Sequence, residues 1–310
     1  MEKKQIAFNK FYKLFNLVSI SLIIISVLLL FFKGLNYGVD FKGGTLIELR
    51  ANDSQINIFK LRQSLLNMKL GDVSVKQFGN QNDYLIKFEK KNDNNPNFIQ
   101  EIKDDLTKSI GPGFNFRRVE NVGPKVSSEL LQSGIIAISL SLIAMLFYIW
   151  LRFEWQFSVG AIAALVHDIV ITIGIFSLLQ IKFDLAIIAA LLTIVGYSLN
   201  DTVVVFDRVR ENLRKYKKTP LKDLLNMSIN ATLSRTVMTS LTTLIALISL
   251  FILGGDVIHG FVFAMIWGVI IGTYSSVFVA SSILLRLGVK RDWDKTNDGK
   301  AGTQFAGIDA

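Results

Sequence analysis

The chain has 310 residues, of which 51% are hydrophobic, and its formal net charge is +9. Its mean hydropathy of +0.42 is too high for an ordinary soluble domain, so the composition predicts a membrane protein with a soluble insert. The chain has no cysteine, only two histidines and no Gly-x-x-x-x-Gly-Lys-[Ser/Thr] loop, which argues against disulfides, a metal cofactor and an ATPase site.

The N-terminal residues predict a membrane anchor. Residues 1–13 are basic and are expected on the cytoplasmic side. Residues 14–32 are continuously apolar and are predicted to form the first transmembrane helix. A cleaved signal peptide is the alternative, but the apolar run is longer than usual and ends in Phe31-Phe32-Lys33 without a small-residue cleavage site. A retained anchor is therefore favoured.

Residues 33–132 are more polar and predict a folded domain outside the membrane. Alternating apolar residues indicate strands, and apolar residues at helical spacing indicate helices, in the order β-α-β-β-α-β. This order is that of a ferredoxin-like unit, so we expect a compact α+β domain on the periplasmic side. The six predicted elements are 46–50, 57–68, 73–78, 84–88, 96–110 and 114–122.

Residues 133–287 predict transmembrane helices two to six. Between the fourth and fifth lies a basic cytoplasmic loop, 207–234, with an amphipathic helix expected near 220–233. Residues 288–310 are a polar tail and are predicted to be disordered in the cytoplasm. The basic loop and the tail could bind acidic lipid or ribosomal RNA. The favoured explanation of their charge is that it fixes the orientation of the chain in the membrane, as the positive-inside rule describes. No nucleic acid partner is predicted. The five spans are 133–151, 157–179, 185–206, 235–253 and 260–285.

The fourth span contains the most informative residues. Asn200 and Asp201 lie inside it, and a carboxylate there costs about 2.5–3.5 kcal/mol on insertion scales. Arg235 begins the fifth span at a similar depth, so we predict that it pairs with Asp201. Burial disfavours the charge of a carboxylate and a guanidinium favours it, so a helix movement would couple protonation to conformation. A salt bridge that only joins two helices is the alternative.

Two further residues are predicted to extend a proton relay through Asn200 and Asp201. Asp168 lies deeper in the third span, and a hydrogen-bonded structural role is its alternative. Thr242 lies on the same side of the fifth span as Arg235. Asp207 and Arg208 lie at the end of the fourth span, where such a pair usually terminates a helix.

Asp168 and Asp201 also allow an enzymatic interpretation. Two carboxylates that share a proton on adjacent spans would suit an intramembrane aspartyl protease. However, Asp168 lies roughly 8 Å deeper than Asp201 at 1.5 Å of rise per residue. Arg235 would also neutralise the dyad, so this interpretation is disfavoured.

Four long motifs resemble the SecF family, which belongs to the resistance–nodulation–division (RND) transporter superfamily. The resemblance extends from Leu14 to about Leu287. The motifs are Gly38-Val39-Asp40-Phe41-Lys42-Gly43-Gly44 after the first span, Val122-Gly123-Pro124-Lys125-Val126 before the second, GYSLNDTVVVFDRVRENLR at 196–214 and LSRTVMTSLTTLIALISLFIL at 233–253.

The resemblance implies a six-helix half-transporter in the bacterial inner membrane, with both termini in the cytoplasm. Such a subunit pairs with SecD and uses the proton-motive force to assist preprotein export through the SecYEG channel. It implies that Asp201 is the membrane carboxylate, that Arg235 is the essential basic residue, and that protons are the coupling ion, with membrane lipids as the surroundings and no cofactor. An RND-like exporter of lipid or small hydrophobic molecules and a purely structural assembly subunit are the alternatives.

Overall fold

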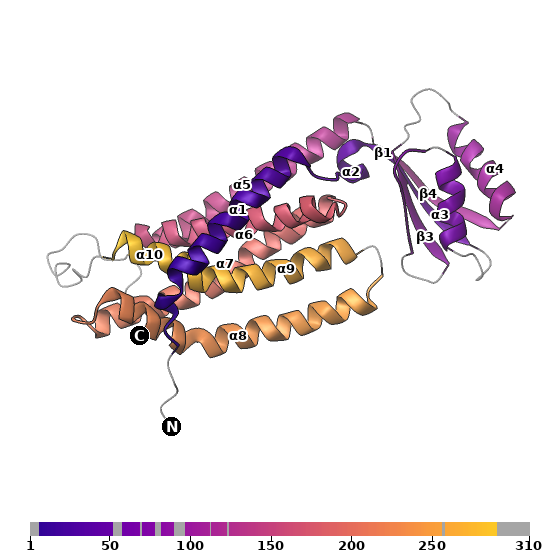
Figure 1. The fold of residues 1–310 in the computed structure, drawn as a ribbon. Helices are drawn as coiled ribbons and strands as arrows, with labels where there is room; N and C mark the ends of the chain where they lie inside the picture. Colours follow the sequence, from indigo (N-terminus) through magenta and orange to yellow (C-terminus); the bar gives the residue numbers. More distant parts are fainter. Residues whose placement is uncertain are drawn as a thin grey trace, which may run out of the picture.

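The structure is a computed structural model that describes residues 6–51, 58–68, 70–77, 82–89, 97–111, 113–122, 124–255 and 258–289. Within these residues, six helical segments are long and apolar enough to cross a membrane. They form a bundle, with a small α+β domain at one end (Figure 1), which confirms the predicted fold class. The segments are α1 (Tyr12–Phe32), α5 (Pro124–Arg152), α6 (Trp155–Leu179), α7 (Leu185–Lys215), α8 (Leu221–Leu253) and α9 (His259–Ser275), the last continued by a π-helical turn (Ser276–Ala280) and α10 (Ser281–Leu287).

Helix α7 is the central element of the bundle. It packs against α5, α6, α8 and α9, whereas α1 packs mainly against α6. Helices α1, α5 and α8 expose most of their apolar side chains, as expected of helices that face lipid. Helix α1 begins, and α10 ends, at the end of the bundle that lies away from the sheet (Figure 1).

The basic segment 207–234 is mostly helical, and the start of α8 confirms the helix expected near 220–233. Helix α7 continues to Lys215 and α8 begins at Leu221, so 207–234 is helical except at residues 216–220. Asp207 and Arg208 therefore lie within α7 and do not end it. The cause is an apolar stripe that continues beyond the span and packs α7 against the start of α8. The buried residues of that stripe are Val209, Leu213, Leu224, Leu225 and Ile229.

The external domain has the predicted element order. Its sheet is antiparallel with strand order β2-β3-β1-β4, and α3 and α4 lie on one side of it (Figure 1). Residue 78 of the predicted strand 73–78, the following residues 79–81 and residues 290–310 of the tail lie outside the described residues. The elements are β1 (Gly44–Ala51), α3 (Ile58–Asn67), β2 (Val73–Gln77), β3 (Asp83–Phe88), α4 (Phe98–Ile110) and β4 (Phe114–Val122).

The core of the domain explains the sequence pattern. Alternate residues of the strands, including Ile47 and Ile86, are fully buried against Leu61 of α3 and Leu106 of α4. Each helix and each central strand therefore buries one of its faces. Apolar residues that recur every 3.6 residues in helices and every two residues in strands predict this arrangement.

Gly174 allows α1 and α6 to pack closely, and its replacement should destabilise the bundle. A Cβ atom at Gly174 would overlap the Ser26 side chain and approach the Ser26 Cα to 3.0 Å. We expect Gly174→Ala to cost about 1–3 kcal/mol of stability, as overpacking usually does. Gly196→Ala is the matched control, because a Cβ there meets nothing within 4 Å. Thermal unfolding in detergent measures both, and equal melting temperatures would contradict this account.

Candidate functional site

Asp201 is a buried carboxylate in the middle of the bundle. It lies on α7 with 3% of its surface exposed, and its Oδ2 has no hydrogen-bond partner within the described residues. Ser240 of α8 lies within hydrogen-bonding reach of the carboxylate, and Arg235 of α8 acts on it electrostatically. A buried carboxylate with one oxygen left without a hydrogen bond is costly when charged, so Asp201 is well placed to bind a proton.

The predicted direct ion pair between Asp201 and Arg235 is not formed in this conformation, although Arg235 still acts on the Asp201 carboxylate electrostatically. Both residues are described, and no hydrogen bond or ion pair joins them. The Arg235 side chain lies on the exposed side of α8 instead. Helices α7 and α8 pack together, so the two side chains are apart because of how each helix is rotated about its own axis. The spacing of residues within one helix does not determine that rotation.

Asn200 and Thr242, predicted as relay residues, are not joined to Asp201 in this conformation. Both are exposed on the outer surface of the bundle. The Thr242 hydroxyl donates to the carbonyl oxygens of Met238 (2.9 Å) and Thr239 (3.0 Å) in its own helix. Their exposure places them at a surface of α7 and α8 that another membrane-embedded chain would have to cover, or that lipid would contact.

Asp168 is the centre of a buried polar cluster that joins three helices. Its Oδ1 lies 2.9 Å from Nδ1 of His167, its neighbour in α6. Its Oδ2 accepts hydrogen bonds from Ser198 of α7 (2.6 Å) and Ser275 of α9 (2.8 Å). Thr172 donates to the Asp168 backbone carbonyl at 2.7 Å. Both oxygens of the Asp168 carboxylate therefore have hydrogen-bond partners. This fits the structural role that was the alternative to a proton relay.

Sequence reasoning missed Ser198 and Ser275, the two serines that satisfy Asp168. The available signal was weak, because a serine in an apolar helix is common and usually bonds to its own backbone. Ser275 directly precedes the π-helical turn Ser276–Ala280, and such turns occur often at functional sites. The turn itself was not predictable from the apolar pattern.

Polar groups continue on both sides of the Asp168 cluster. The His167 ring stacks on Tyr274 with 6.0 Å between centroids, and the Tyr274 hydroxyl lies 2.8 Å from Ser19 Oγ of α1. On the other side, Ser240 of α8 lies 2.7 Å from Thr273 of α9. The bundle therefore contains the Asp168 cluster, which extends toward Ser19 of α1, and the Ser240–Thr273 pair, which lies beside Asp201.

The two buried carboxylates do not form a proteolytic dyad. The hydrogen bonds of Asp168 go to His167, Ser198 and Ser275, and none joins it to Asp201 in the described part of the chain. A dyad requires two carboxylates that share one proton. The aspartyl protease interpretation therefore has no geometric support.

Removing Ser275 tests the strength of this cluster. Ser275→Ala should cost about 1–3 kcal/mol, because a buried acceptor loses a donor. Ser139→Ala is the matched control, since the exposed Ser139 hydroxyl also bonds to its own helix, at Ile135, but contacts no carboxylate. Its effect should stay within about 0.5 kcal/mol. Chemical or thermal unfolding in detergent measures both, and equal losses would contradict the role given to Ser275.

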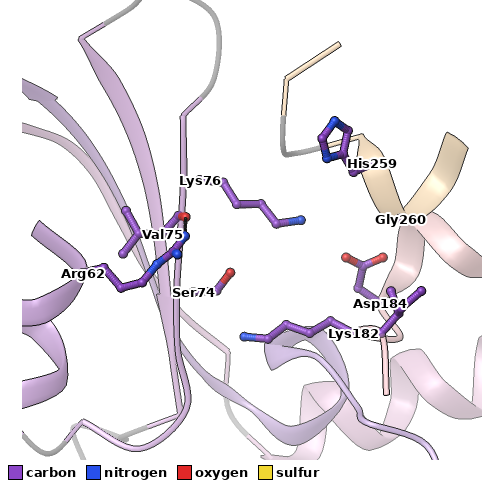
Figure 2. Close-up of a pocket in the computed structure, with 9 residues that line it drawn as sticks. Arg62, Ser74, Val75, Lys76, Lys182, Asp184, His259 and Gly260 are labelled. Atoms are coloured by element: carbon purple, nitrogen blue, oxygen red, sulfur yellow. Dashed lines mark hydrogen bonds between the residues drawn. The ribbon is translucent and has the colours of Figure 1, made fainter. Parts of the chain in front are cut away.

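A polar cavity of about 290 Å³ separates the external domain from the bundle (Figure 2). The domain contributes Arg62, Ser74 and Lys76, and the membrane side contributes Lys182, Asp184 and other residues of the helix turns. This cavity lies at the α6–α7 turn, at the opposite end of α7 from the turn into α8. It is therefore separate from the buried carboxylates.

Comparison with protein families identifies matches over most of the chain. A family model described as "Protein export membrane protein SecD/SecF, C-terminal" matches residues 102–290. A second, "SecD/SecF GG Motif", matches residues 28–55. The first alone covers more than half of the chain.

Individual relatives agree with the family models. Protein translocase subunit SecF of Cereibacter sphaeroides is 51% identical over 286 residues, which cover 89% of this chain and 87% of the relative. SecF of Vibrio alginolyticus is 45% identical, with 94% and 92% covered. The crystal structure of SecDF, a translocon-associated membrane protein from Thermus thermophilus, is 36% identical with a TM-score of 0.77. The match covers 92% of this chain but only 39% of the SecDF chain.

Proposed function

The chain belongs to the SecF family of protein-translocase subunits, and from this premise we propose that it is one half of a proton-driven transporter that assists protein export. Its partner would be SecD, and together they would act on preproteins that emerge from the SecYEG channel. The observation that carries the proposal is the buried Asp201 carboxylate in the central helix, one of whose oxygens has no hydrogen-bond partner within the described residues. The transport function needs no ATPase site in this chain, because protons supply the free energy.

A SecD partner would explain the polar surface on α7 and α8. Asn200, Arg235 and Thr242 are exposed there, although both helices are apolar enough to span a membrane. Polar and charged side chains that face hydrocarbon are costly, and they usually face a protein or a watery cavity instead. A second membrane subunit on this face would cover them. It would also place its own carboxylate near Asp201, as the family resemblance implies.

The orientation follows from charge. Arg208, Arg214 and Lys215 lie at the end of α7 that is farther from the external domain, and basic residues are retained on the cytoplasmic side. Both described termini lie at this same end (Figure 1). The external domain would then stand in the periplasm of the bacterial inner membrane, where it can contact an emerging polypeptide.

A proton cycle at Asp201 supplies the driving force in this proposal. A proton that crosses the membrane potential contributes roughly 2.3 kcal/mol per 100 mV. Protonation removes the charge of Asp201, and release restores it, so the preferred packing of α7 against α8 changes in each cycle. Arg235 would approach Asp201 in the charged state and turn outward in the neutral state. The conformation in which they are apart fits the neutral state.

Purification of this chain from native membranes in mild detergent tests the proposal. Mass spectrometry should identify a SecD-like chain and components of the translocation channel with it. Export of a reporter preprotein into inverted membrane vesicles should also depend on both this chain and an imposed proton gradient. The proposal would be refuted if the chain were purified with neither a SecD-like chain nor channel components, and if export did not depend on the proton gradient.

A further inference from the structure

The short segment between α1 and the sheet forms a joint that contacts three parts of the molecule. It contains α2 (Val39–Lys42), which follows Gly38 and leads through Gly43 into β1. The Gly38 amide donates to the Phe183 carbonyl (2.8 Å), and the Phe183 amide donates to the Asn36 carbonyl (2.8 Å). The segment is therefore fixed by backbone bonds to the turn between α6 and α7.

Two glycines explain why the joint can be so close to this turn. A Cβ at Gly38 would lie 3.3 Å from the Asp184 Cβ and 3.4 Å from the Phe183 carbonyl oxygen, so a larger residue would push the segment away. Gly43 has a φ of +80°, a conformation that other residues rarely adopt. The glycines thus allow α2 to contact the start of α7 and then turn into the sheet.

Asp40 joins the start of α7 to the sheet through one carboxylate. Its Oδ2 accepts a hydrogen bond from the Leu185 amide, the first residue of α7, at 3.3 Å. Its Oδ1 pairs with Lys87 of β3 at 3.2 Å. Only 19% of the Asp40 side chain and 22% of the Lys87 side chain are exposed. The partial burial makes this pair stronger than an ordinary surface salt bridge.

Asp184 places a second carboxylate at the same helix start. It caps α7 by accepting from the Ile187 amide at 3.3 Å. Burial raises the pKa of the Asp184 carboxyl, and the neighbouring Asp40 also raises it. Lys87 and Lys76 act in the opposite direction. The start of α7 and the strands of the external domain therefore share one cluster of charges.

Beyond the joint, the domain and the bundle meet across a polar cavity and through an ion pair. Figure 2 shows Lys76 and Lys182 reaching into the cavity between the sheet and the helix turns, with Asp184 on the membrane side. Lys182 pairs with Asp72 across this boundary at 2.9 Å. A polar boundary resists movement less than a packed apolar one. The contact that binds the first residue of α7 directly, from the Leu185 amide to Asp40, is therefore where displacement of α7 would reach the sheet.

We propose that Asp40 is a positioning residue that transmits movement of α7 to the external domain. The proposal rests on the proposed proton cycle, because Asp201 lies on the same helix, 16 residues or roughly 24 Å from Leu185. A continuous helix moves nearly as a rigid body over this distance. A shift at Asp201 therefore displaces the Leu185 amide, and Asp40 passes the displacement to Lys87 and the sheet.

Distance measurements between spin labels test this role directly. The chain has no cysteine, so Lys60→Cys in α3 and Leu253→Cys at the end of α8 provide two unique, exposed labelling sites. The labelled protein is measured with its native membrane partners, with Asp201 and with Asp201→Asn. We expect the label–label distance to differ between these two forms. Asp40→Ala should remove the difference and lower proton-stimulated export roughly 5- to 10-fold.

Two further variants separate transmission from stability. Lys87→Met removes the contact of Asp40 with the sheet but keeps the Asp40–Leu185 and Asp184–Ile187 hydrogen bonds at the α7 start, so it should also remove the difference. Lys42→Met is the matched control, because Lys42 of α2 pairs with Glu89 of the external domain at 2.8 Å but does not contact α7. It should retain the difference. Since Asp184 still caps α7 in every variant, helix formation does not depend on Asp40.

The outcomes distinguish this inference from the proposed function. A distance difference that survives both Asp40→Ala and Lys87→Met overturns the role of Asp40. Equal distances with Asp201 and Asp201→Asn also overturn it, because nothing would then be transmitted. The proposed proton cycle is judged separately, by whether Asp201→Asn blocks proton-dependent export.

Discussion

Asp201→Asn is expected to abolish proton-stimulated export while leaving the protein folded and assembled. Asparagine is nearly the same size but cannot release a proton, so the cycle at α7 stops. Losing one coupled proton removes roughly 2.3 kcal/mol per 100 mV, a bias of about 50-fold. The measurement is export of a reporter preprotein into inverted membrane vesicles, with and without an imposed proton gradient.

The stability of the same variant should change little. The Asp201 Oδ2 has no hydrogen-bond partner within the described residues. Asparagine keeps an oxygen that can accept from Ser240 and removes a buried charge. Asp207→Asn is the matched control, because Asp207 lies on the same helix but is half-exposed. It should export normally. Normal gradient-dependent export by Asp201→Asn would remove Asp201 from the cycle.

The fold followed from local pattern. Apolar length predicted six spans, and the alternation around Ile47 and Ile86 predicted the sheet, because each signal is contained in one element and depends on no distant contact. The limits of α7 and α8 were less predictable. The helix near 220–233 was expected, but the continuation of α7 to Lys215 was not. That continuation depends on packing of Leu213 against the start of α8, which is a contact between elements.

The site was only partly predictable for a related reason. A carboxylate in an apolar span, such as Asp168 or Asp201, stands out in the sequence because of its cost. Which partners it has depends on three or four helices at once. Ser198 and Ser275 come to Asp168 from α7 and α9, and the rotation of α8 turns Arg235 outward. Helical spacing within one span carries no information about these rotations.

Arg235→Met is expected to reduce proton-stimulated export as severely as Asp201→Asn. Methionine keeps much of the apolar stem of arginine but carries no charge, so a charged Asp201 would have no cation to approach. In the present conformation Arg235 is exposed and is not bonded to Asp201. Its loss should therefore change the melting temperature little, and the defect should appear in export rather than in folding. Gradient-dependent export in vesicles and thermal unfolding in detergent measure the two effects.

The double variant decides what the arginine does. If Arg235 served only to neutralise Asp201, then adding Asp201→Asn to Arg235→Met would remove the unpaired charge and restore export. If the two groups exchange between paired and separated states during a proton cycle, both are needed and the double variant stays inactive. The separation found here favours the second result, because a static neutralising pair would be in contact. Restored export would instead show that Asp201 and Arg235 form a structural pair, and the proton cycle would have to run through another group.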